Sequence, residues 1–383
     1  MATLSRDGVT WLVYSCMSVY GYFVYGFGPT VPLIGADLDV SRAVAGLHGT
    51  ALAVGAVLAG LIGPALVGRF GRGTTLRVGL AGLAIGLTGY LHGTSIAMSL
   101  TGAAIAGTFG SMVVNTHSAV LSHQYGSAGP AAISEANALA AGFGLLAPVV
   151  IGAAAAAGLG WRAGLLLTCV AAVVVLAATV RIGVPAGPVP PALDTSRRDT
   201  LPAAFWPALA VLVLCIGTEF SLTFWSSELL RERTGTGTAV ATGSVAALVA
   251  GMTVGRIVGG KVALVHDADR LLSASFGLAL IGFTLLWTST TLWLSVTGLG
   301  IVGLGLAVQF PLSIARVIAA SGGRPDLATA RASIGAGIAI GTAPFLLGYL
   351  ADLVGTHRAF LLVPALLALA ALALRVSRPA PHR

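Results

Sequence analysis

The stretch "APVVIGAAAAAGLGWRAGLL", residues 147–166, recurs later in the chain as "APFLLGYLADLVGTHRAFLL", residues 343–362. The two copies share an initial Ala-Pro, a glycine and an alanine in the middle, an Arg-Ala pair and a final Leu-Leu pair. All of these matches fall at one constant spacing of 196 residues, the difference between positions 343 and 147. A parallel repeat of this kind predicts a chain built from two similar halves.

The composition around these copies indicates a membrane protein. The chain has 383 residues, of which 56% are hydrophobic and only 9% are charged, and its mean hydropathy is +0.93. Ordinary soluble domains carry about 25% charged residues, so a globular enzyme with a solvated surface is excluded. We therefore expect an all-α polytopic membrane protein. In such a protein a net charge of +8 reflects basic cytoplasmic loops rather than a nucleic-acid partner.

Apolar runs near the length that crosses a bilayer, roughly 20 residues, recur along the whole chain. The first run is long and is followed by many others, so we interpret it as a retained span and not as a cleaved signal peptide. Reading the runs between polar or Gly/Pro breaks predicts twelve transmembrane spans. They cover residues 10–34, 44–67, 75–92, 98–123, 133–157, 162–181, 204–230, 238–262, 270–289, 292–318, 329–352 and 358–376.

The basic residues predict the orientation of these spans. An N-terminus in the cytoplasm places 16 of the 21 lysines and arginines at cytoplasmic loops or helix ends, as the positive-inside rule requires. The other five are Arg42, Arg162, Arg231, Arg233 and Arg358. An even number of spans puts both termini on the cytoplasmic side of the cell membrane.

One long polar break, "PAGPVPPALDTSRRDTLP" at residues 185–202, is rich in proline and has two adjacent arginines. It is typical of a linker between domains. The expected organisation is a six-helix half at 1–181, a cytoplasmic linker at 182–203 and a second six-helix half at 204–383.

The segment "PALVGRFGRG", residues 64–73, resembles the loop between the second and third spans of the major facilitator superfamily, G-x-L-A-D-R-x-G-R-R. Arg69, Gly71 and Arg72 match its Arg, Gly and first following Arg, whereas Gly68 replaces the aspartate and Pro64 the leading glycine. The resemblance implies two pseudo-symmetric six-helix bundles, and a cytoplasmic gate that involves Arg69, Gly71 and Arg72.

The same resemblance extends over the whole chain at the level of spans, halves and linker. "VVNTHSAVLSHQYG" and "GMTVGRIVGG" are loosely similar to the fucose-permease-type branch, and "FGLLAPVVIG" is a degenerate form of the drug/proton antiporter signature. In the second half, Asp267 or Asp269 lies in the loop equivalent to residues 64–73 and supplies acidic charge there.

The function that the resemblance implies is secondary active transport of a small organic solute by alternating access, with a site near the bilayer midplane. We expect a monomer that uses no cofactor and draws on a proton gradient. The alternatives are a drug or metabolite efflux antiporter, an uncoupled facilitator, and, from a different class, a non-transporting membrane receptor or scaffold.

Two strings that imitate nucleotide sites do not support an enzyme. "GLGIVG" at 298–303 and "GRIVGGK" at 255–261 satisfy glycine-loop spacings, but each lies in or at the end of a predicted span without the strand that such loops require. No metal-binding spacing is present, and the three cysteines fall in apolar runs, where thiols act as small hydrophobes.

The resemblance also implies that the first, fourth, seventh and tenth spans line the central cavity. Residues three, four or seven apart share one face of a helix, and this spacing selects the polar side chains that face the cavity. The residues expected to line the substrate cavity are Tyr14, Ser18, Tyr22, Asn115, Thr223, Gln309 and Ser313.

Each of these residues has an alternative role. Serine and threonine in membrane helices also bond their own backbone carbonyls, and tyrosines near span ends are interfacial anchors. His117 we interpret as a packing residue. Glu135 is expected at the start of the fifth span, where a helix N-terminus favours negative charge. Asp37 and Asp39 lie close enough along the chain to pair with Arg42.

Glu219 lies deep in the apolar run "LVLCIGTEFSLTFW", residues 212–225. It is roughly 22 Å along its span from residue 204, and an ionised carboxylate facing lipid at that depth is strongly disfavoured. We predict that it faces the bundle interior and carries the coupling proton or binds the substrate's positive charge. The alternative is a static hydrogen bond or ion pair, for which Arg316 is the nearest basic candidate by helix assignment.

Overall fold

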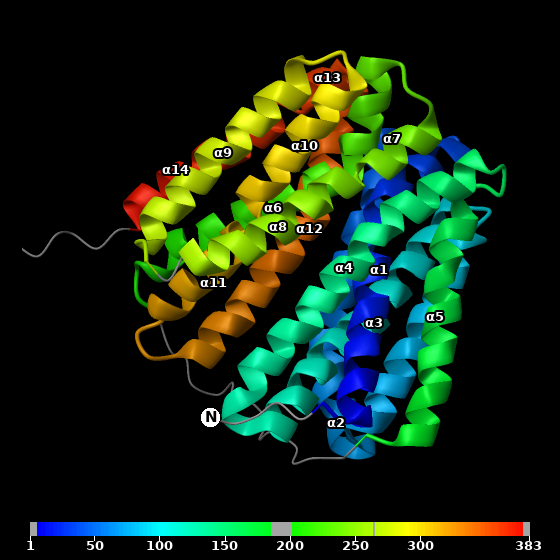
Figure 1. Cartoon of the computed structure of the whole chain (residues 1–383), viewed down its shortest axis with the longest axis vertical. Coiled ribbons are helices and arrows are strands. Elements are labelled where there is room, and N and C mark those ends of the chain that lie inside the picture. Colours follow the sequence, from blue (N-terminus) through cyan, green and yellow to red (C-terminus); the bar gives the residue numbers. More distant parts are fainter. Residues whose placement is uncertain (1–5, 185–200, 263–264, 378–383) are drawn as a thin grey trace, which may run out of the picture. The chain divides into compact units, whose positions relative to one another are not determined.

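The computed structural model describes residues 6–184, 201–262 and 265–377, and in these ranges every regular element is a helix. The N-terminal part begins with α1, which the side chain of Asp7 caps by accepting a hydrogen bond from the Thr10 backbone N–H. The elements up to residue 184 are α1 (Gly8–Asp37), α2 (Arg42–Leu91), α3 (Ile96–Tyr125), the short 3-10 helix η1 (Gly126–Ala128), α4 (Gly129–Ala156) and α5 (Trp161–Ile182) (Figure 1).

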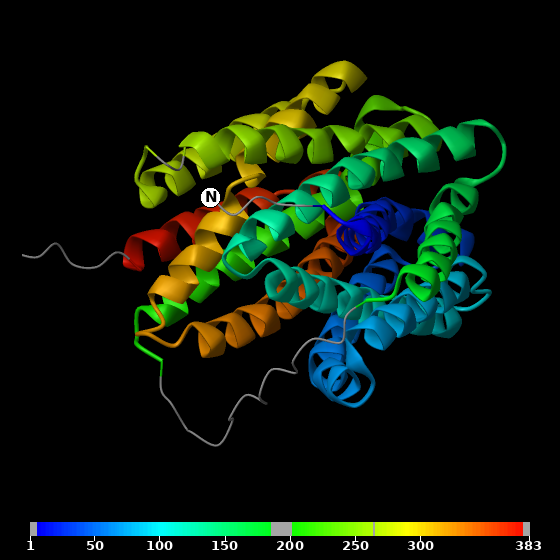
Figure 2. The ribbon, with the colours of Figure 1, turned by 60° about the horizontal axis from the view of Figure 1, so that its bottom comes forward.

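The C-terminal part contains more helices because several spans are interrupted. Its elements are α6 (Phe205–Thr234), α7 (Thr238–Ser244), α8 (Ala246–Val262), α9 (Ala268–Thr288), α10 (Leu292–Leu306), α11 (Gln309–Ala319), α12 (Pro325–Val354), α13 (Thr356–Ala359) and α14 (Leu362–Val376). They are labelled in Figure 1 and run from green to red in Figure 2.

Ten helical stretches of the described chain are long and apolar enough to cross a membrane. One of them is α2, with 50 residues, in which two helices are joined at a kink. α1 is not among the ten, although it has 30 residues, because tyrosines and serines dilute its apolar sequence. Counting α2 as two spans and adding α1 brings the number to the predicted twelve, and the predicted fold class is confirmed.

The link between the second and third spans differs from the loop expected at residues 68–74. The helix runs on through this segment except at Gly71, whose φ of 78° and ψ of 165° are not helical. A positive φ is costly for residues with a Cβ and is readily adopted by glycine. The chain therefore changes direction at this one residue, and the matched signature lies in a helical hairpin.

Three predicted spans are broken in the second half. α7 and α8 are separated at Val245, α10 and α11 at Ala307 and Val308, and α13 and α14 at Phe360 and Leu361. The second break has a cause in the sequence: the ring of Pro311 would clash with the carbonyl of residue 307, four positions earlier, in a continuous helix.

The helices form two compact units. Unit 1 consists of Met1–Asp39 and Leu47–Asp194, and unit 2 of Val40–Gly46 and Thr195–Arg383. The boundary after Asp194 falls within the predicted linker, most of which (185–200) lies outside the described residues. The assignment of Val40–Gly46 to unit 2 was not predicted.

The repeated sequence occupies equivalent places in the two units. Its first copy forms the end of α4 and the start of α5, and its second copy forms the end of α12, all of α13 and the start of α14. Pro148 lies inside α4 and Pro344 inside α12. The turn that follows uses a glycine with positive φ in each copy, Gly160 at 77° and Gly355 at 83°.

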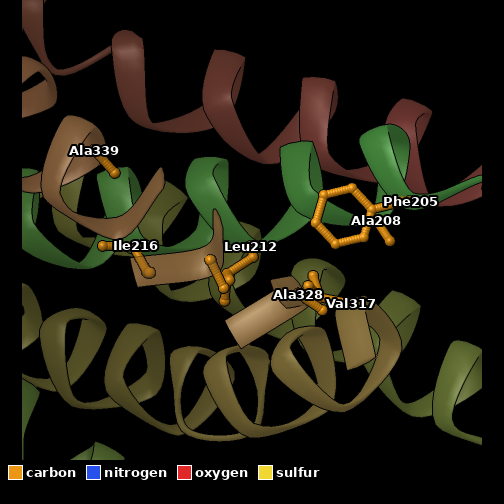
Figure 3. Packing of buried hydrophobic residues seen from close by; sticks show 8 residues of the cluster. Phe205, Ala208, Leu212, Ile216, Val317, Ala328 and Ala339 are labelled. Carbon is orange, nitrogen blue, oxygen red and sulfur yellow. The ribbon is translucent and has the colours of Figure 1, made fainter. Parts of the chain in front are cut away.

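The core of unit 2 is built on one face of α6. Phe205, Ala208, Leu212 and Ile216 are spaced three or four residues apart, so they share a face, and they pack with Val317 of α11 and with alanines of α12 (Figure 3). The small alanine side chains let α12 lie close to α6. This core fixes α6 and α11 against each other and so positions the polar residues between them.

Glycines bring α8 into backbone contact with α10 and with the break that follows it. A Cβ at Gly251 would lie 2.1 Å from the carbonyl oxygen of Gly300, and a Cβ at Gly255 would lie 2.5 Å from the Ala307 Cβ. Such small-residue contacts are how membrane helices pack closely. The two strings that imitate nucleotide loops lie in these helices, where Gly255 and its neighbours serve packing.

Candidate functional site

The first part of the site is Glu219, on α6 of unit 2. Its backbone carbonyl accepts a hydrogen bond of 2.8 Å from the Thr223 hydroxyl, but within residues 6–184, 201–262 and 265–377 its carboxylate accepts none. Arg256 of α8 lies within electrostatic range of the carboxylate. Glu219 is therefore a half-buried acid that interacts electrostatically with an arginine of α8 and accepts no side-chain hydrogen bond from the described residues.

The second part is Gln309, the first residue of α11 after the break. Its side chain is only 1% exposed, and neither its Nε2 nor its Oε1 has a hydrogen-bond partner among the described residues. A buried amide without partners is costly, so Gln309 is a candidate for ligand binding.

Gln309 and Glu219 lie at the same level of unit 2. The hydroxyl of Ser313, one turn after Gln309, donates to the Sγ of Cys215 at 3.9 Å, and Val317, a further turn on, packs in the core formed by the start of α6. Rising residue numbers on α11 thus match falling numbers on α6, and the two helices run antiparallel. Gln309 lies one turn before Ser313 on α11, and Glu219 lies one turn after Cys215 on α6. The two residues are therefore at the same height along the antiparallel pair.

We group Glu219, Arg256, Gln309 and Ser313 as the break site, because each lies beside the break between α10 and α11 or at its level on α6 and α8. Three helices position it: α6 carries the acid, α11 carries the amide and hydroxyl, and α8 packs on the break through Gly255 and carries the arginine beside that glycine. The sequence predicted Glu219, Gln309 and Ser313, but it did not identify Arg256, which was assigned only to topology.

Arg316 is not the partner of Glu219. Its guanidinium forms an ion pair with Asp269 of α9 and donates a hydrogen bond of 2.7 Å to the Ser377 hydroxyl. Arg316 therefore interacts with Asp269 and Ser377 and not with Glu219. The basic residue near Glu219 is Arg256, not Arg316 as expected from the helix assignment.

A second polar cluster lies in unit 1, where α1 packs along α4. The Tyr14 hydroxyl donates a 3.0 Å hydrogen bond to Glu135 Oε2. Arg6 donates to both oxygens of the same carboxylate, from Nε to Oε2 at 3.0 Å and from Nη2 to Oε1 at 2.7 Å. Glu135 lies in the second turn of α4, which begins at Gly129, and not at the helix end where it was expected. Its carboxylate is held by Arg6 and Tyr14 and not by the helix N-terminus.

This cluster closes one end of a cavity of about 580 Å³, which we call the α1–α4 pocket. The rest of the wall is apolar. Arg6 and Glu135 were missed as site residues because an arginine before a first span and a glutamate at a helix start both have ordinary explanations. The pocket is lined by Arg6, Trp11, Tyr14, Glu135, Ala138, Leu139, Gly142, Phe143 and Leu146.

Three of the predicted cavity residues direct their hydroxyls to backbone carbonyls. Ser18 donates to Tyr14 O at 2.9 Å, Thr223 donates to Glu219 O, and Tyr22 donates to Gly164 O of α5 at 2.8 Å. Tyr22 therefore binds a neighbouring helix and does not join Tyr14. Asn115 is exposed on α3, and its amide makes no hydrogen bond within the described parts of the chain.

The residues of the signature at 64–73 occupy different environments. Arg69 is exposed, and its guanidinium carbon lies 5.2 Å from the centroid of the Phe70 ring. Arg72 is buried, with 5% of its surface exposed. Their expected role at a gate stays a prediction.

Other titratable residues are used in packing. His117 is buried and its ring nitrogen contacts the Val114 carbonyl, as expected for a packing residue. Cys16, Cys169 and Cys215 are buried free thiols. Over the described residues no group of three histidines, cysteines or acids is arranged to hold a metal ion.

The expected pairing of Arg42 with Asp37 or Asp39 is wrong, because Arg42 and Asp37 use other partners. Asp37 accepts hydrogen bonds from Arg162 at 2.6 Å and from Trp161 at 2.9 Å. Arg42 instead pairs with Glu228 at 3.3 Å, and the backbone N–H of Arg42 donates to Asp352 at 3.0 Å. These bonds explain why the first residues of α2 group with unit 2.

Two repeated bundles of membrane-spanning helices, with polar side chains at buried positions within the spans, are typical of membrane transporters. The chain belongs to the Major Facilitator Superfamily, whose family model matches residues 13–291. It is therefore a multi-pass membrane protein of a secondary-transporter family that acts on small-molecule solutes. The family model describes the whole superfamily and does not distinguish its branches. The likeness to the fucose-permease-type branch therefore stays a prediction.

Solved structures show the same fold at low sequence identity. A mutant of the nucleoside transporter NupG is 12% identical with a TM-score of 0.79, and 97% of this chain and 99% of that one are covered. The xylose transporter XylE from E. coli is 13% identical with a TM-score of 0.77 and coverage of 97% and 99%. A structure described as a D-xylose-proton symporter is 14% identical with a TM-score of 0.78 and coverage of 97% and 98%. No curated protein matches the chain.

Proposed function

We propose that this protein transports a small organic solute across the cell membrane, coupled to protons, and that Glu219 carries the proton. The observation that supports this proposal is the carboxylate of Glu219, which lies within a membrane helix, accepts no hydrogen bond from the described chain and is opposed by Arg256. Acids within membrane spans mark ion and substrate pathways.

The arrangement of the break site gives the proton a mechanical effect. An ionised Glu219 attracts the guanidinium of Arg256, whereas a protonated Glu219 does not. Protonation therefore changes the interaction between α6 and α8, and a ligand or proton that interacts differently with two conformations shifts their populations. Gln309, at the same level, supplies hydrogen bonds to the solute.

The remaining parts of the proposal follow from the family and the charge distribution. The solute moves by alternating access of the two six-helix halves, with both termini in the cytoplasm and with the monomer as the functional unit. The fold neighbours include a D-xylose-proton symporter and a nucleoside transporter, so transport of a polar organic solute together with a proton is a function that this fold can support.

The test uses purified protein in liposomes. D-xylose, uridine, amino acids, organic acids and organic cations are first screened for thermal stabilisation, because a ligand of the folded state raises its stability by mass action. The stabilising compound is then used as the radiolabelled solute. One pH unit of gradient corresponds to 1.36 kcal/mol, or about tenfold accumulation for one proton per solute.

Glu219→Gln is expected to abolish this accumulation while solute exchange without a gradient continues. The matched control is Glu228→Gln, an acid on the same helix that pairs with Arg42 and Arg231. Accumulation by Glu219→Gln at the wild-type rate would make the glutamate structural and would overturn the proposal.

A further inference from the structure

At its polar end the α1–α4 pocket has one acidic residue, Glu135, and one basic residue, Arg6. Both carboxylate oxygens of Glu135 accept hydrogen bonds, whereas Arg6 has N–H groups that Glu135 does not use. Glu135 accepts two hydrogen bonds from Arg6 and one from Tyr14, and both of its carboxylate oxygens are used. A guanidinium has five N–H groups, and only two of those on Arg6 are used by Glu135. The surplus at this end of the pocket is therefore in hydrogen-bond donors, which suits an acceptor.

The surplus is accessible. Arg6 has 45% of its side chain exposed and Glu135 has 34%, so the remaining N–H groups of Arg6 can be reached from outside. A second acid nearby, Asp7, does not take them, because it accepts from Thr10 at 2.8 Å and from Gln124 at 2.9 Å. Planar guanidinium groups bind carboxylates and phosphates in preference to neutral acceptors.

The other walls of the pocket suit an apolar body. Trp11 is 53% exposed, Phe143 48% and Leu146 49%, and the Trp11 ring stands edge-on to Tyr14 at 5.8 Å. The cavity of about 580 Å³ lies within the range of 300–1,000 Å³ that is typical of small-molecule sites. A ligand with a long apolar part and one anionic end matches both regions.

We propose that the α1–α4 pocket binds an amphipathic organic anion, with its carboxylate or phosphate on Arg6 and its apolar body against Trp11, Phe143 and Leu146. The site lies wholly in unit 1 and shares no residue with the break site. It stands independently of proton coupling by Glu219. Two sources offer this chemistry, a soluble carboxylate and an anionic phospholipid.

The experiment measures equilibrium binding to the full-length protein in nanodiscs of uncharged phosphatidylcholine. The probe is ω-bromodecanoate, whose bromine quenches tryptophan fluorescence on contact, and the neutral comparison is ω-bromodecanol. Saturable quenching is expected for the acid and not for the alcohol. Trp11→Phe should remove most of the quenching while the acid still raises the thermal stability.

Three variants separate the site from general electrostatics. Arg6→Gln is expected to weaken binding about tenfold or more, since it removes a charge-assisted hydrogen bond to the anion. Arg331→Gln, which removes an exposed arginine of α12, should leave binding unchanged. Glu135→Gln should tighten binding, because it removes the carboxylate that competes for Arg6, and a misfolded protein would not gain affinity.

A second arm places the wild type and Arg6→Gln in nanodiscs with brominated phosphatidylglycerol or brominated phosphatidylcholine. Quenching that depends on Arg6 with the soluble acid supports a solute site, and the same dependence with phosphatidylglycerol alone supports a lipid site. If quenching is the same in Arg6→Gln and the wild type in both arms, or if Glu135→Gln loses binding as Arg6→Gln does, the proposal is overturned.

Discussion

At the scale of single residues, the unpaired amide of Gln309 predicts a conflict between stability and function. An unsatisfied buried polar group costs about 1–3 kcal/mol, whereas an apolar side chain of similar shape removes that cost. Gln309→Met should therefore leave the free energy of unfolding unchanged or raise it, and should weaken solute binding about tenfold. Thermal unfolding in detergent and uptake into liposomes measure the two effects.

The control for Gln309 is in unit 1. Thr168 is also buried, at 1% exposure, and its hydroxyl has no partner among the described residues. Thr168→Val should gain stability in the same way without changing uptake. A Gln309→Met protein that unfolds more easily and transports normally would show that the amide has a structural role.

The sequence located these residues better than it located their partners. Glu219 and Gln309 are identifiable because carboxyl and amide groups are rare in apolar spans. Arg256 was missed because its contact with Glu219 depends on how α8 packs on the break before α11, and no spacing along the chain encodes that contact. The signal for the break itself was present in Pro311.

At the scale of helices, the contact between α8 and α10 predicts sensitivity to a single methyl group. A Cβ at Gly251 would lie 2.1 Å from the Gly300 carbonyl oxygen, so Gly251→Ala forces the two helices apart. Overpacking of this kind costs about 1–3 kcal/mol. The expected result is a lower unfolding temperature of the purified protein in detergent.

Gly277 of α9 provides the matched comparison, because a Cβ there meets nothing within 4 Å. Gly277→Ala should be neutral or should stabilise the protein by up to about 1 kcal/mol through helix propensity. Equal unfolding temperatures for Gly251→Ala and Gly277→Ala would contradict the close approach of α8 and α10.

Helix positions were predictable from apolar runs, but the hydropathy of those runs did not reveal the interruptions within them. The predicted spans at 238–262 and 292–318 each consist of two helices, because a short break does not change the hydropathy of a run. The reverse error occurred at residues 68–74, where polar residues indicated a loop and the helix continues around Gly71. Hydropathy records burial in lipid, whereas helix continuity depends on backbone dihedrals.

At the scale of the whole molecule, the repeat and the twelve apolar runs were sufficient to predict the fold class. They did not predict that Val40–Gly46 groups with unit 2. That grouping depends on Asp352, which accepts backbone hydrogen bonds from Arg42 at 3.0 Å and from Ala43 at 2.8 Å. These partners are about 310 residues apart in the sequence, and Asp352 is not one of the matched positions of the repeat.

The distribution of basic residues predicts the orientation of the whole chain. Because cytoplasmic loops are enriched in lysine and arginine, the 16-to-5 division of the 21 basic residues places the 185–202 linker and the C-terminus in the cytoplasm. Green fluorescent protein fused at either place should fluoresce, and alkaline phosphatase should be inactive there. Insertion at residues 235–237, between α6 and α7, should give the reverse result. Replacing Arg197 and Arg198 with glutamine should not invert the chain, since other basic cytoplasmic loops remain. Active phosphatase at the linker or the C-terminus would require a different number of spans or the opposite orientation.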